Sequence, residues 1–197
     1  MNTSSMMRTA WVALRNVILF TLLIGVVYTG AVTGVGQLIF HDHANGSPLK
    51  NAQGQVVGSK ILAQNFTDDK YFAPRPSAAG DDGYDATSSG GTNYGPENQD
   101  LVDSIKNRKA DVAKREHVSE DKVPADAVTA SASGLDPDIS PEYASIQIDR
   151  VAKARGTDRA TIEKIVDKHI HNASLGYLGD KAVNVVELNN ALDSRGK

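Results

Sequence analysis

The chain has 197 residues and a formal net charge of −3, because 24 Asp and Glu residues outweigh 21 Lys and Arg residues. This balance excludes a strongly basic nucleic-acid-binding protein, so no nucleic-acid partner is expected. The sequence contains no cysteine, which excludes disulfide scaffolds, cysteine-ligated zinc, iron–sulfur clusters and thiol catalysis. The length allows one ordinary domain with a small appendage.

An apolar segment near the N-terminus, residues 16–40, carries no charged side chain after Arg15. At about 1.5 Å per residue, the helix from Val17 to Phe40 would be about 36 Å long. That length is enough to cross a hydrocarbon core of about 30 Å. The alternative is a cleaved signal peptide, whose apolar core usually runs about 7–15 residues. The longer segment here predicts a retained transmembrane helix in the lipid bilayer.

Charges on either side of this segment predict its direction. Arg8 and Arg15 precede it, Asp42 follows it, and the next residue with a fixed positive charge is Lys50. Positive residues stay on the cytoplasmic side, so residues 1–15 are expected to be cytoplasmic. We therefore expect a single-pass protein of the inner or plasma membrane, whose main domain is extracytoplasmic. The absence of cysteine fits a bacterial envelope protein.

Small residues mark one face of the predicted span. Residues with four-residue spacings on this face are Gly25, Thr29, Gly30, Thr33 and Gly34. Such faces let a second helix approach closely. The sequence therefore predicts a contact with a partner helix, and a transport function would require partners because one span cannot form a channel.

The rest of the chain divides into a polar segment, residues 41–55, that reads as a linker or loose hairpin, and a domain at residues 56–197. Residues 56–66 are expected to form a short strand with a bend at Gly58, and residues 73–96 a long loop. Helices are predicted at 96–116, with Pro96 in the first position, at 141–156, at 158–171 and from residue 184. The expected fold class is α+β: one transmembrane helix, then a small helix-rich extracytoplasmic domain with a few short strands.

The ends of the last three predicted helices have local signals. Ser140 precedes Pro141, Gly156 follows the second helix, and Asn184 with Glu187 forms a pair like a capping box. His169 and His171 are placed at the end of the third helix, facing different directions, where they would complement the helix dipole.

No metal site is expected. His41 and His43 flank Asp42, but a flexible linker would hold a metal ion only weakly. His169 and His171 cannot share one ion if they point in different directions from one helix.

The sequence also lacks the GxSxG elbow of serine hydrolases. Ser131 and Ser133 lie in a stretch that reads as a turn, and Asp136 and Asp138 form a possible carboxylate pair that more simply builds a turn before Ser140. A hydrolase that uses Asp136 or Ser133 is the last of our alternatives.

A glycine-rich loop, residues 88–96, precedes the predicted helix at 96–116. Backbone amides in such a loop can bind an anion, although the loop lacks the lysine of a P-loop. A loop shaped for protein contact is favoured. The alternative function is an autonomous membrane-anchored envelope module that binds a small anion at residues 88–96.

Several loop strings carry a family resemblance. In chain order they are YFAPRPSA at 71–78, SSGGTNYGPEN at 88–98, VPADAVTASASGLDPDISPEYA at 123–144 and VNVVELNNAL at 183–192. Together with the N-terminal span, they closely resemble the C subunit of the bacterial Kdp potassium-transporting ATPase. The departures are mild: Thr92 stands where the family usually has Ser, and Tyr94 where it often has Leu.

The resemblance implies a non-catalytic accessory subunit of a high-affinity, ATP-driven potassium uptake complex. Its partners would be a channel-like potassium-binding subunit and a P-type ATPase subunit, and it would stabilise assembly. It would also act as a catalytic chaperone that promotes ATP binding by the ATPase subunit. It would have no cofactor of its own, and ATP would be involved only through the partner.

Site residues follow from the same resemblance. Gln147 is the position linked to nucleotide. The residues expected to shape docking or structural loops are Arg75, Pro76, Ser77, Asn93, Gly95, Pro96, Ser133, Gly134, Asp136 and Pro137. An extracytoplasmic domain cannot touch cytoplasmic ATP, so any effect on ATP affinity is expected to act through the partner's conformation.

Overall fold

A computed structural model describes residues 3–195 of the chain. Its contacts divide the chain into two compact units, Met1–Ser47 and Pro48–Lys197. The first unit holds the apolar segment and a short helix after it, and the second holds the other helices and the strands.

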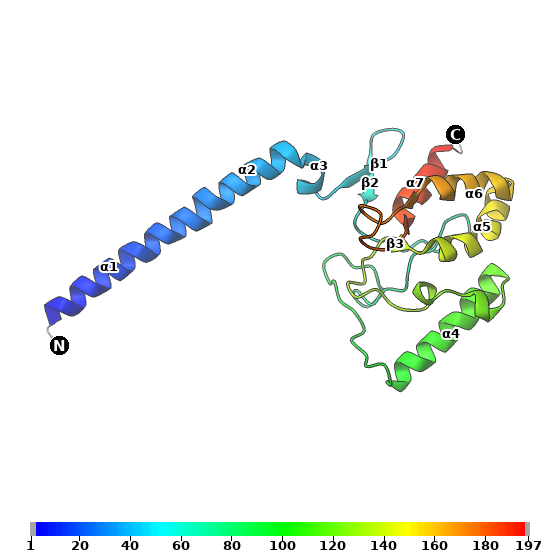
Figure 1. The fold of residues 1–197 in the computed structure, drawn as a ribbon, viewed down its shortest axis with the longest axis horizontal. Coiled ribbons are helices and arrows are strands. Elements are labelled where there is room, and N and C mark those ends of the chain that lie inside the picture. Colours follow the sequence, from blue (N-terminus) through cyan, green and yellow to red (C-terminus); the bar gives the residue numbers. More distant parts are fainter. Residues whose placement is uncertain (1–2, 196–197) are drawn as a thin grey trace. The chain divides into compact units, whose positions relative to one another are not determined.

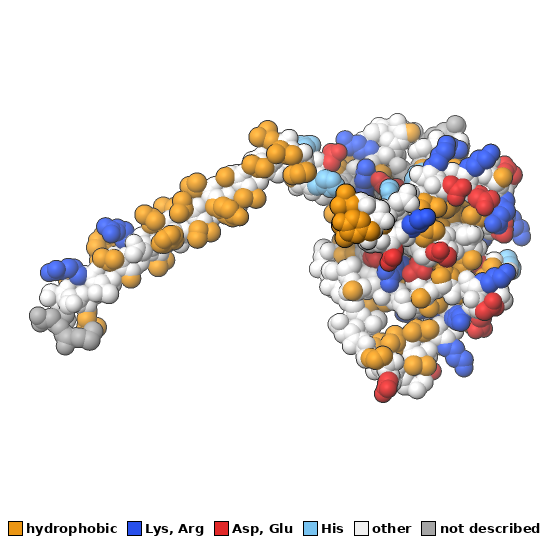
Figure 2. Space-filling model, viewed as in Figure 1, with side chains coloured by type: hydrophobic (Ala, Val, Ile, Leu, Met, Phe, Trp, Pro, Cys, Tyr) orange, Lys and Arg blue, Asp and Glu red, His pale blue; other side chains and the backbone are white. Residues whose placement is uncertain are grey.

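The first unit is dominated by one helix (Figure 1), which is built from α1 (Thr3–Leu22), a π-helical turn η1 (Leu23–Tyr28) and α2 (Thr29–Ile39). From Thr3 to Ile39 it is long and apolar enough to cross a membrane. Hydrophobic side chains cover much of its visible surface (Figure 2), and a short helix α3 (His41–Ala44) follows it. The helix predicted over residues 16–40 is confirmed, although it also includes most of residues 1–15.

The π-helical turn changes how the small residues are arranged along this helix. The Thr29 Oγ1 hydroxyl donates to the Ile24 carbonyl at 3.0 Å, five residues earlier. A π-turn rotates less per residue than an α-turn, so Gly25 inside η1 is not in line with the later small residues as a regular α-helix would place it. The other four small residues lie within α2.

The second unit combines helices with two small antiparallel sheets. One is the hairpin of β1 (Pro48–Lys50) and β2 (Val56–Ser59), and the other has the strand order β3-β5-β4. The strands of the second sheet are β3 (Asp138–Ile139), β4 (Ile170–His171) and β5 (Ala182–Asn184). The helices are α4 (Gln99–Glu116), α5 (Pro141–Arg155), α6 (Arg159–Lys168) and α7 (Val185–Arg195), with 3₁₀ turns η2 (Glu120–Lys122) and η3 (Ala125–Ala127). The predicted α+β class is therefore confirmed.

Helix caps account for three of the four predicted helices. Ser140 Oγ accepts from the Tyr143 amide at the start of α5, and Gly156 ends it with φ of 63°. Asp158 caps α6. Asn184 Oδ1 accepts from the amides of Val186 and Glu187 and so begins α7. These caps satisfy amides that have no partner inside the helix.

The start of α4 differs from the prediction. Asn98 Oδ1 accepts from the amides of Asp100 and Leu101, so the helix begins at Gln99 and Pro96 is not its first residue. The Asn98 amide instead donates to the Gly95 carbonyl at 3.0 Å, which places Pro96 in the second position of a turn, where its fixed φ fits. The side-chain cap determines the helix start here.

Two other predicted elements are too long. Helix α6 ends at Lys168, because Ile170 and His171 pair with β5, and so the prediction that His169 and His171 share a helix is wrong. The strand expected over residues 56–66 ends at Ser59. No helix or strand lies between Ser59 and Gln99, as predicted for residues 73–96.

The core of the second unit lies among α5, α6, α7 and the three-stranded sheet. Its largest fully buried apolar side chains include Phe72, Ile148, Val151, Ile162, Val183 and Leu188. Phe72 comes from the long loop, and burying a side chain of this size contributes about 1.5–3 kcal/mol. The loop is therefore part of the core, and residues beside Phe72 are held at the centre of the domain.

Candidate functional site

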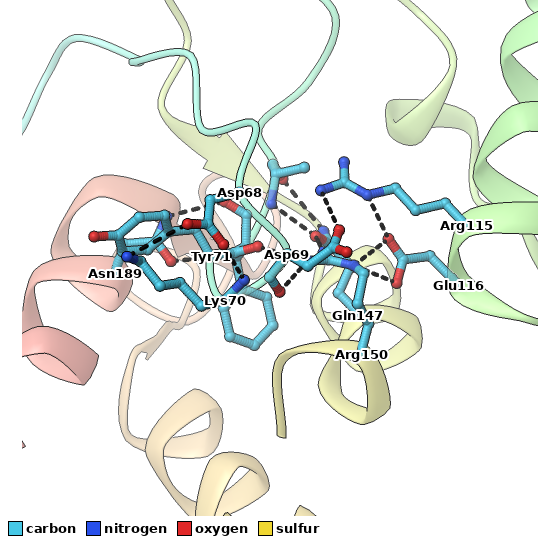
Figure 3. A network of polar contacts seen from close by, with 11 residues as sticks. Asp68, Asp69, Lys70, Tyr71, Arg115, Glu116, Gln147, Arg150 and Asn189 are labelled. Atoms are coloured by element: carbon cyan, nitrogen blue, oxygen red, sulfur yellow. Dashed lines mark hydrogen bonds and ion pairs between the residues drawn. The ribbon is translucent and has the colours of Figure 1, made fainter. Parts of the chain in front are cut away.

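Residues 69–73, here called the clamped segment, run through the domain without forming a strand. Figure 3 shows that side chains from helices surround their backbone. Phe72 and Ala73 are buried, and backbone groups that are buried need hydrogen-bond partners. Side chains of α5 and α7 supply these partners in place of a neighbouring strand.

Two buried amide side chains bind this segment in the same way. Asn189 accepts from the Phe72 amide and donates to the Phe72 carbonyl, both at 2.9 Å. Gln147 accepts from the Ala73 amide at 2.7 Å and donates to the Ala73 carbonyl at 3.2 Å. Both side chains are almost completely inaccessible to solvent. Each therefore satisfies the full backbone hydrogen-bonding capacity of one residue.

Two arginines bind the remaining carbonyls of the clamped segment. The Arg150 guanidinium donates to the carbonyls of Asp69 and Tyr71 at 2.6 and 2.9 Å. It also donates to Gln147 Oε1 at 2.8 Å. Arg155 donates to the Lys70 carbonyl at 2.7 Å. Every residue from 69 to 73 is thus bound by a side chain of α5 or α7.

Glu116, at the end of α4, completes this network. Its two carboxylate oxygens accept from Arg150 Nε at 3.0 and 2.9 Å, and its side chain is 1% exposed. Burial raises the pKa of the Glu116 carboxyl, although Arg150 and then Arg115 act in the opposite direction. The pair joins α4 to α5 and compensates the charge of Arg150.

A second group of contacts, here called the loop cluster, joins residues 75–91 to residues 131–138. Arg75 pairs with Asp136 at 3.0 Å. The Ser77 hydroxyl donates to the Gly134 carbonyl at 2.6 Å and accepts from the Tyr84 amide at 2.8 Å. The sequence-predicted residues Arg75, Ser77, Gly134 and Asp136 therefore lie together.

Gly134 is required at the centre of the loop cluster. Its φ is 68°, a conformation that glycine adopts without cost. A Cβ atom there would lie 2.7 Å from the Ala79 Cβ and 2.7 Å from the Gly90 carbonyl oxygen. Any side chain at this position would push the two loops apart.

The other predicted loop residues fall into two groups. Pro76 accepts at its carbonyl from the Ser131 amide at 3.1 Å, and Pro137 accepts from the Val185 amide at 2.9 Å, so both hold the loops in place. Asn93, Gly95 and Pro96 are exposed and lie outside these contacts. They are positioned to form part of a surface and do not hold the domain together.

The arrangement does not favour hydrolysis. The Ser133 hydroxyl lies 3.2 Å from Ser131 Oγ and accepts from the Leu135 amide, with no histidine in its network. Asp136 is engaged by Arg75 and by the Asp138 amide. Burial, followed by the charge of Asp136, raises the pKa of Asp138. These groups build the turn that the sequence predicts.

The described residues offer no cluster of metal ligands, and several amides near the glycine-rich loop are already hydrogen-bonded. Within residues 3–195, no group of three or more His, Asp or Glu side chains could hold a metal ion. In the glycine-rich loop the Gly90 amide donates to the Ser133 carbonyl, and Asn98 already occupies the N-terminal amides of α4. The Gly90 amide and two amides at the start of α4 are therefore used by the chain itself.

Four residues that bind the clamped segment or support its ligands were not identified from the sequence. They are Glu116, Arg150, Arg155 and Asn189. One signal was available, because Asn189 and Arg150 occur next to apolar positions of amphipathic helices that face the core. A polar residue at such a position needs a buried partner. The sequence does not say that the partner is the backbone of a distant loop.

Comparison with known proteins identifies the family of this chain. Residues 10–194 match the family model described as "KdpC: K+-transporting ATPase, c chain". A Mycobacterium tuberculosis protein named potassium-transporting ATPase KdpC subunit is 49% identical over 182 residues, which cover 92% of this chain and 95% of the relative. Proteins of the same name from Beijerinckia indica and Caulobacter vibrioides are each 48% identical over 183 residues, 93% of this chain and 92% and 91% of the relatives. The chain therefore belongs to the KdpC family of potassium-transporting ATPase subunits.

Proposed function

We infer that this chain is a non-catalytic accessory subunit of an ATP-driven potassium uptake complex. Its partners in this proposal are a channel-like potassium-binding subunit and a P-type ATPase subunit. The family match over residues 10–194 and the apolar helix Thr3–Ile39 support a membrane-anchored transport subunit. In this role it stabilises assembly and promotes ATP binding by the ATPase subunit.

The burial of Gln147 is the observation that carries the proposed mechanism. This residue, which the family resemblance links to nucleotide, is fully buried. Its amide oxygen accepts from Ala73 and Arg150, and its amide nitrogen donates to Ala73. A nucleotide would have to break these hydrogen bonds to reach it. Gln147 therefore holds the clamped segment, and its effect on ATP passes through the partner as coupling between distant sites.

Charge distribution around the anchor supports the same mechanism. Arg8 and Arg15 lie before the apolar segment and Asp42 after it, which favours an extracytoplasmic domain. About 30 Å of hydrocarbon would then separate the domain from cytoplasmic ATP. An accessory subunit in this position acts on nucleotide affinity only through the conformation of its partners.

Replacing Gln147 by Leu tests the mechanism. The change leaves the buried Ala73 amide and carbonyl without partners, at a cost of about 1–3 kcal/mol for each group. We expect the yield of purified complex to fall, whereas the complex that does assemble keeps the KM for ATP of the wild type. Gln53→Leu, at an exposed loop position, is the matched control and should change neither quantity.

Tagged full-length chain should be purified from native membranes, with the co-purifying proteins identified and ATP turnover measured per complex. Recovery of a P-type ATPase and a channel-like subunit is expected. A normal yield of Gln147→Leu complex with a raised KM for ATP would contradict a purely structural role for Gln147. Absence of both large subunits would contradict the accessory role itself.

A further inference from the structure

The loop between β4 and β5, residues 172–181, carries an exposed apolar tip. Leu175, Tyr177 and Leu178 are 80%, 74% and 53% exposed. No charged residue lies between His171 and Asp180. Figure 2 shows a hydrophobic patch on the visible face where Figure 1 places this loop. The tip is thus apolar and uncharged.

The tip is an ordered turn. Ser174 and Leu178 exchange two backbone hydrogen bonds, each 2.9 Å long. The Gly176 amide donates to Ala173, and the Tyr177 amide to Ser174. Leu175 adopts a φ of 55°, which is uncommon for a leucine, and the turn directs its side chain outward. Most amides at the tip are satisfied inside the turn, as entry into an apolar medium requires.

The chain keeps this domain close to a bilayer. Ile39 ends the apolar helix and Pro48 begins β1, so the connection between them measures at most about 30 Å when fully extended. Such a tether gives the domain surface a high effective concentration at the membrane. A small apolar tip can then bind reversibly without strong affinity of its own.

We propose that the turn Ser174–Leu178 inserts into the interfacial region of the lipid bilayer. Tyrosine is enriched at this depth, where its ring is buried and its hydroxyl stays hydrated. Leu175 and Leu178 supply apolar area on either side of it. Three side chains are few for a protein interface, which typically buries about 800 Å² on each partner, but they are sufficient for a tethered membrane contact. Insertion would limit the orientations that the domain adopts above the membrane.

The proposal can be tested by placing a tryptophan at the tip and measuring, from its fluorescence, whether it enters the lipid. The native Trp11 is first replaced by Phe, and Tyr177→Trp is then made in the full-length chain. Tyr94→Trp is the matched control, because Tyr94 is also an exposed aromatic residue of a loop in the same domain, 45% exposed. Both variants are reconstituted into vesicles containing phosphatidylcholine brominated along the acyl chain.

Insertion predicts a blue-shifted emission for the residue 177 probe and several-fold stronger quenching by brominated lipid than for the residue 94 probe. Adding Leu175→Asp should remove that quenching, because a charge at the tip opposes entry into the bilayer. Equal, weak quenching at both positions would overturn the proposal. A blue shift that appears only with the partner subunits, without quenching by brominated lipid, would also overturn it and assign the tip to a protein surface.

Discussion

Arg150 is the residue on which most contacts of the clamped segment converge. It binds two carbonyls of that segment, the Gln147 amide oxygen and both oxygens of Glu116. A buried ion pair is expensive to desolvate, so its net contribution to stability is modest. Removing one partner alone is costly because the other charge remains buried. The pair joins α4 to α5, and Arg150 joins both helices to the long loop.

Arg150→Met should lower the free energy of unfolding by about 3–5 kcal/mol, because it leaves Glu116 and two loop carbonyls without their partner. The double variant Glu116→Gln/Arg150→Met should recover part of that loss, since no unpaired charge remains. Denaturant unfolding of the full-length chain in detergent, followed by near-ultraviolet circular dichroism, measures the coupling. Equal stability of the single and double variants would show that the Glu116 charge is not buried as described.

Alanine variants of Gly134 and Gly156 distinguish the cost of backbone strain from the cost of steric crowding. Both have positive φ, 68° and 63°, but a Cβ at Gly134 would lie within 3 Å of other atoms, whereas one at Gly156 would meet none within 4 Å. Gly156→Ala should cost only about 1–2 kcal/mol, the left-handed backbone term. Gly134→Ala has the same backbone cost and must also displace Ala79 and Gly90. Its decrease in the free energy of unfolding should therefore be clearly larger in the same measurement. Similar losses would contradict close contact in the loop cluster.

Helix α5 is the element that connects the core to the clamped segment. Ile148 and Val151 pack in the core, while Gln147 and Arg150 bind the loop backbone. The residues Ser140, Pro141 and Gly156 fix its two ends. One helix with strong local start and end signals therefore positions the contacts that hold a long loop.

Helix α2 is the element for which a partner contact is predicted. Gly30 and Gly34 have no atoms within 4 Å of a Cβ position, so Leu fits there within the single chain. Gly30→Leu with Gly34→Leu should leave membrane insertion intact and lower the yield of purified complex, because bulk prevents close helix approach. Val32→Leu with Val35→Leu, on another face of α2, is the control. Unchanged yield for the glycine variant would exclude this face as a contact.

The accuracy of sequence-based prediction varies between elements for physical reasons. The ends of α5 and the start of α7 depend on neighbouring residues such as Ser140 and Asn184, and the sequence predicts them well. The end of α6 depends on pairing between Ile170 and Val183, which is a tertiary interaction. The clamped segment is harder still, because Gln147 and Ala73 meet only after the whole domain folds. Local signals therefore predicted most of the elements and the family resemblance named residues of the loop cluster, but neither predicted the side chains that bind the clamped segment.

At the scale of the whole molecule, the chain combines an apolar helix with a domain that has an apolar core and a long loop held by polar side chains. The second unit contains a fully buried Gln147 and no group suited to metal binding among the residues described. The family match identifies a subunit of a potassium-transporting ATPase, and the charges around the apolar segment are the basis for proposing that the domain faces away from the cytoplasm. We propose that any effect of the domain on ATP binding is exerted from the opposite side of the membrane.

Measuring on which side of the membrane the domain lies tests the proposed indirect action on ATP. Because the chain has no cysteine, a single introduced thiol can report the side. Ser145→Cys places a thiol on the exposed surface of α5, and Ser4→Cys places one before the apolar segment. Intact cells, with any outer membrane made permeable, are treated with a membrane-impermeant thiol reagent. With the domain outside the cytoplasm, residue 145 should be labelled in intact cells and residue 4 only after inner-membrane lysis. Labelling of residue 145 only after lysis would place the domain in the cytoplasm and contradict indirect action on ATP.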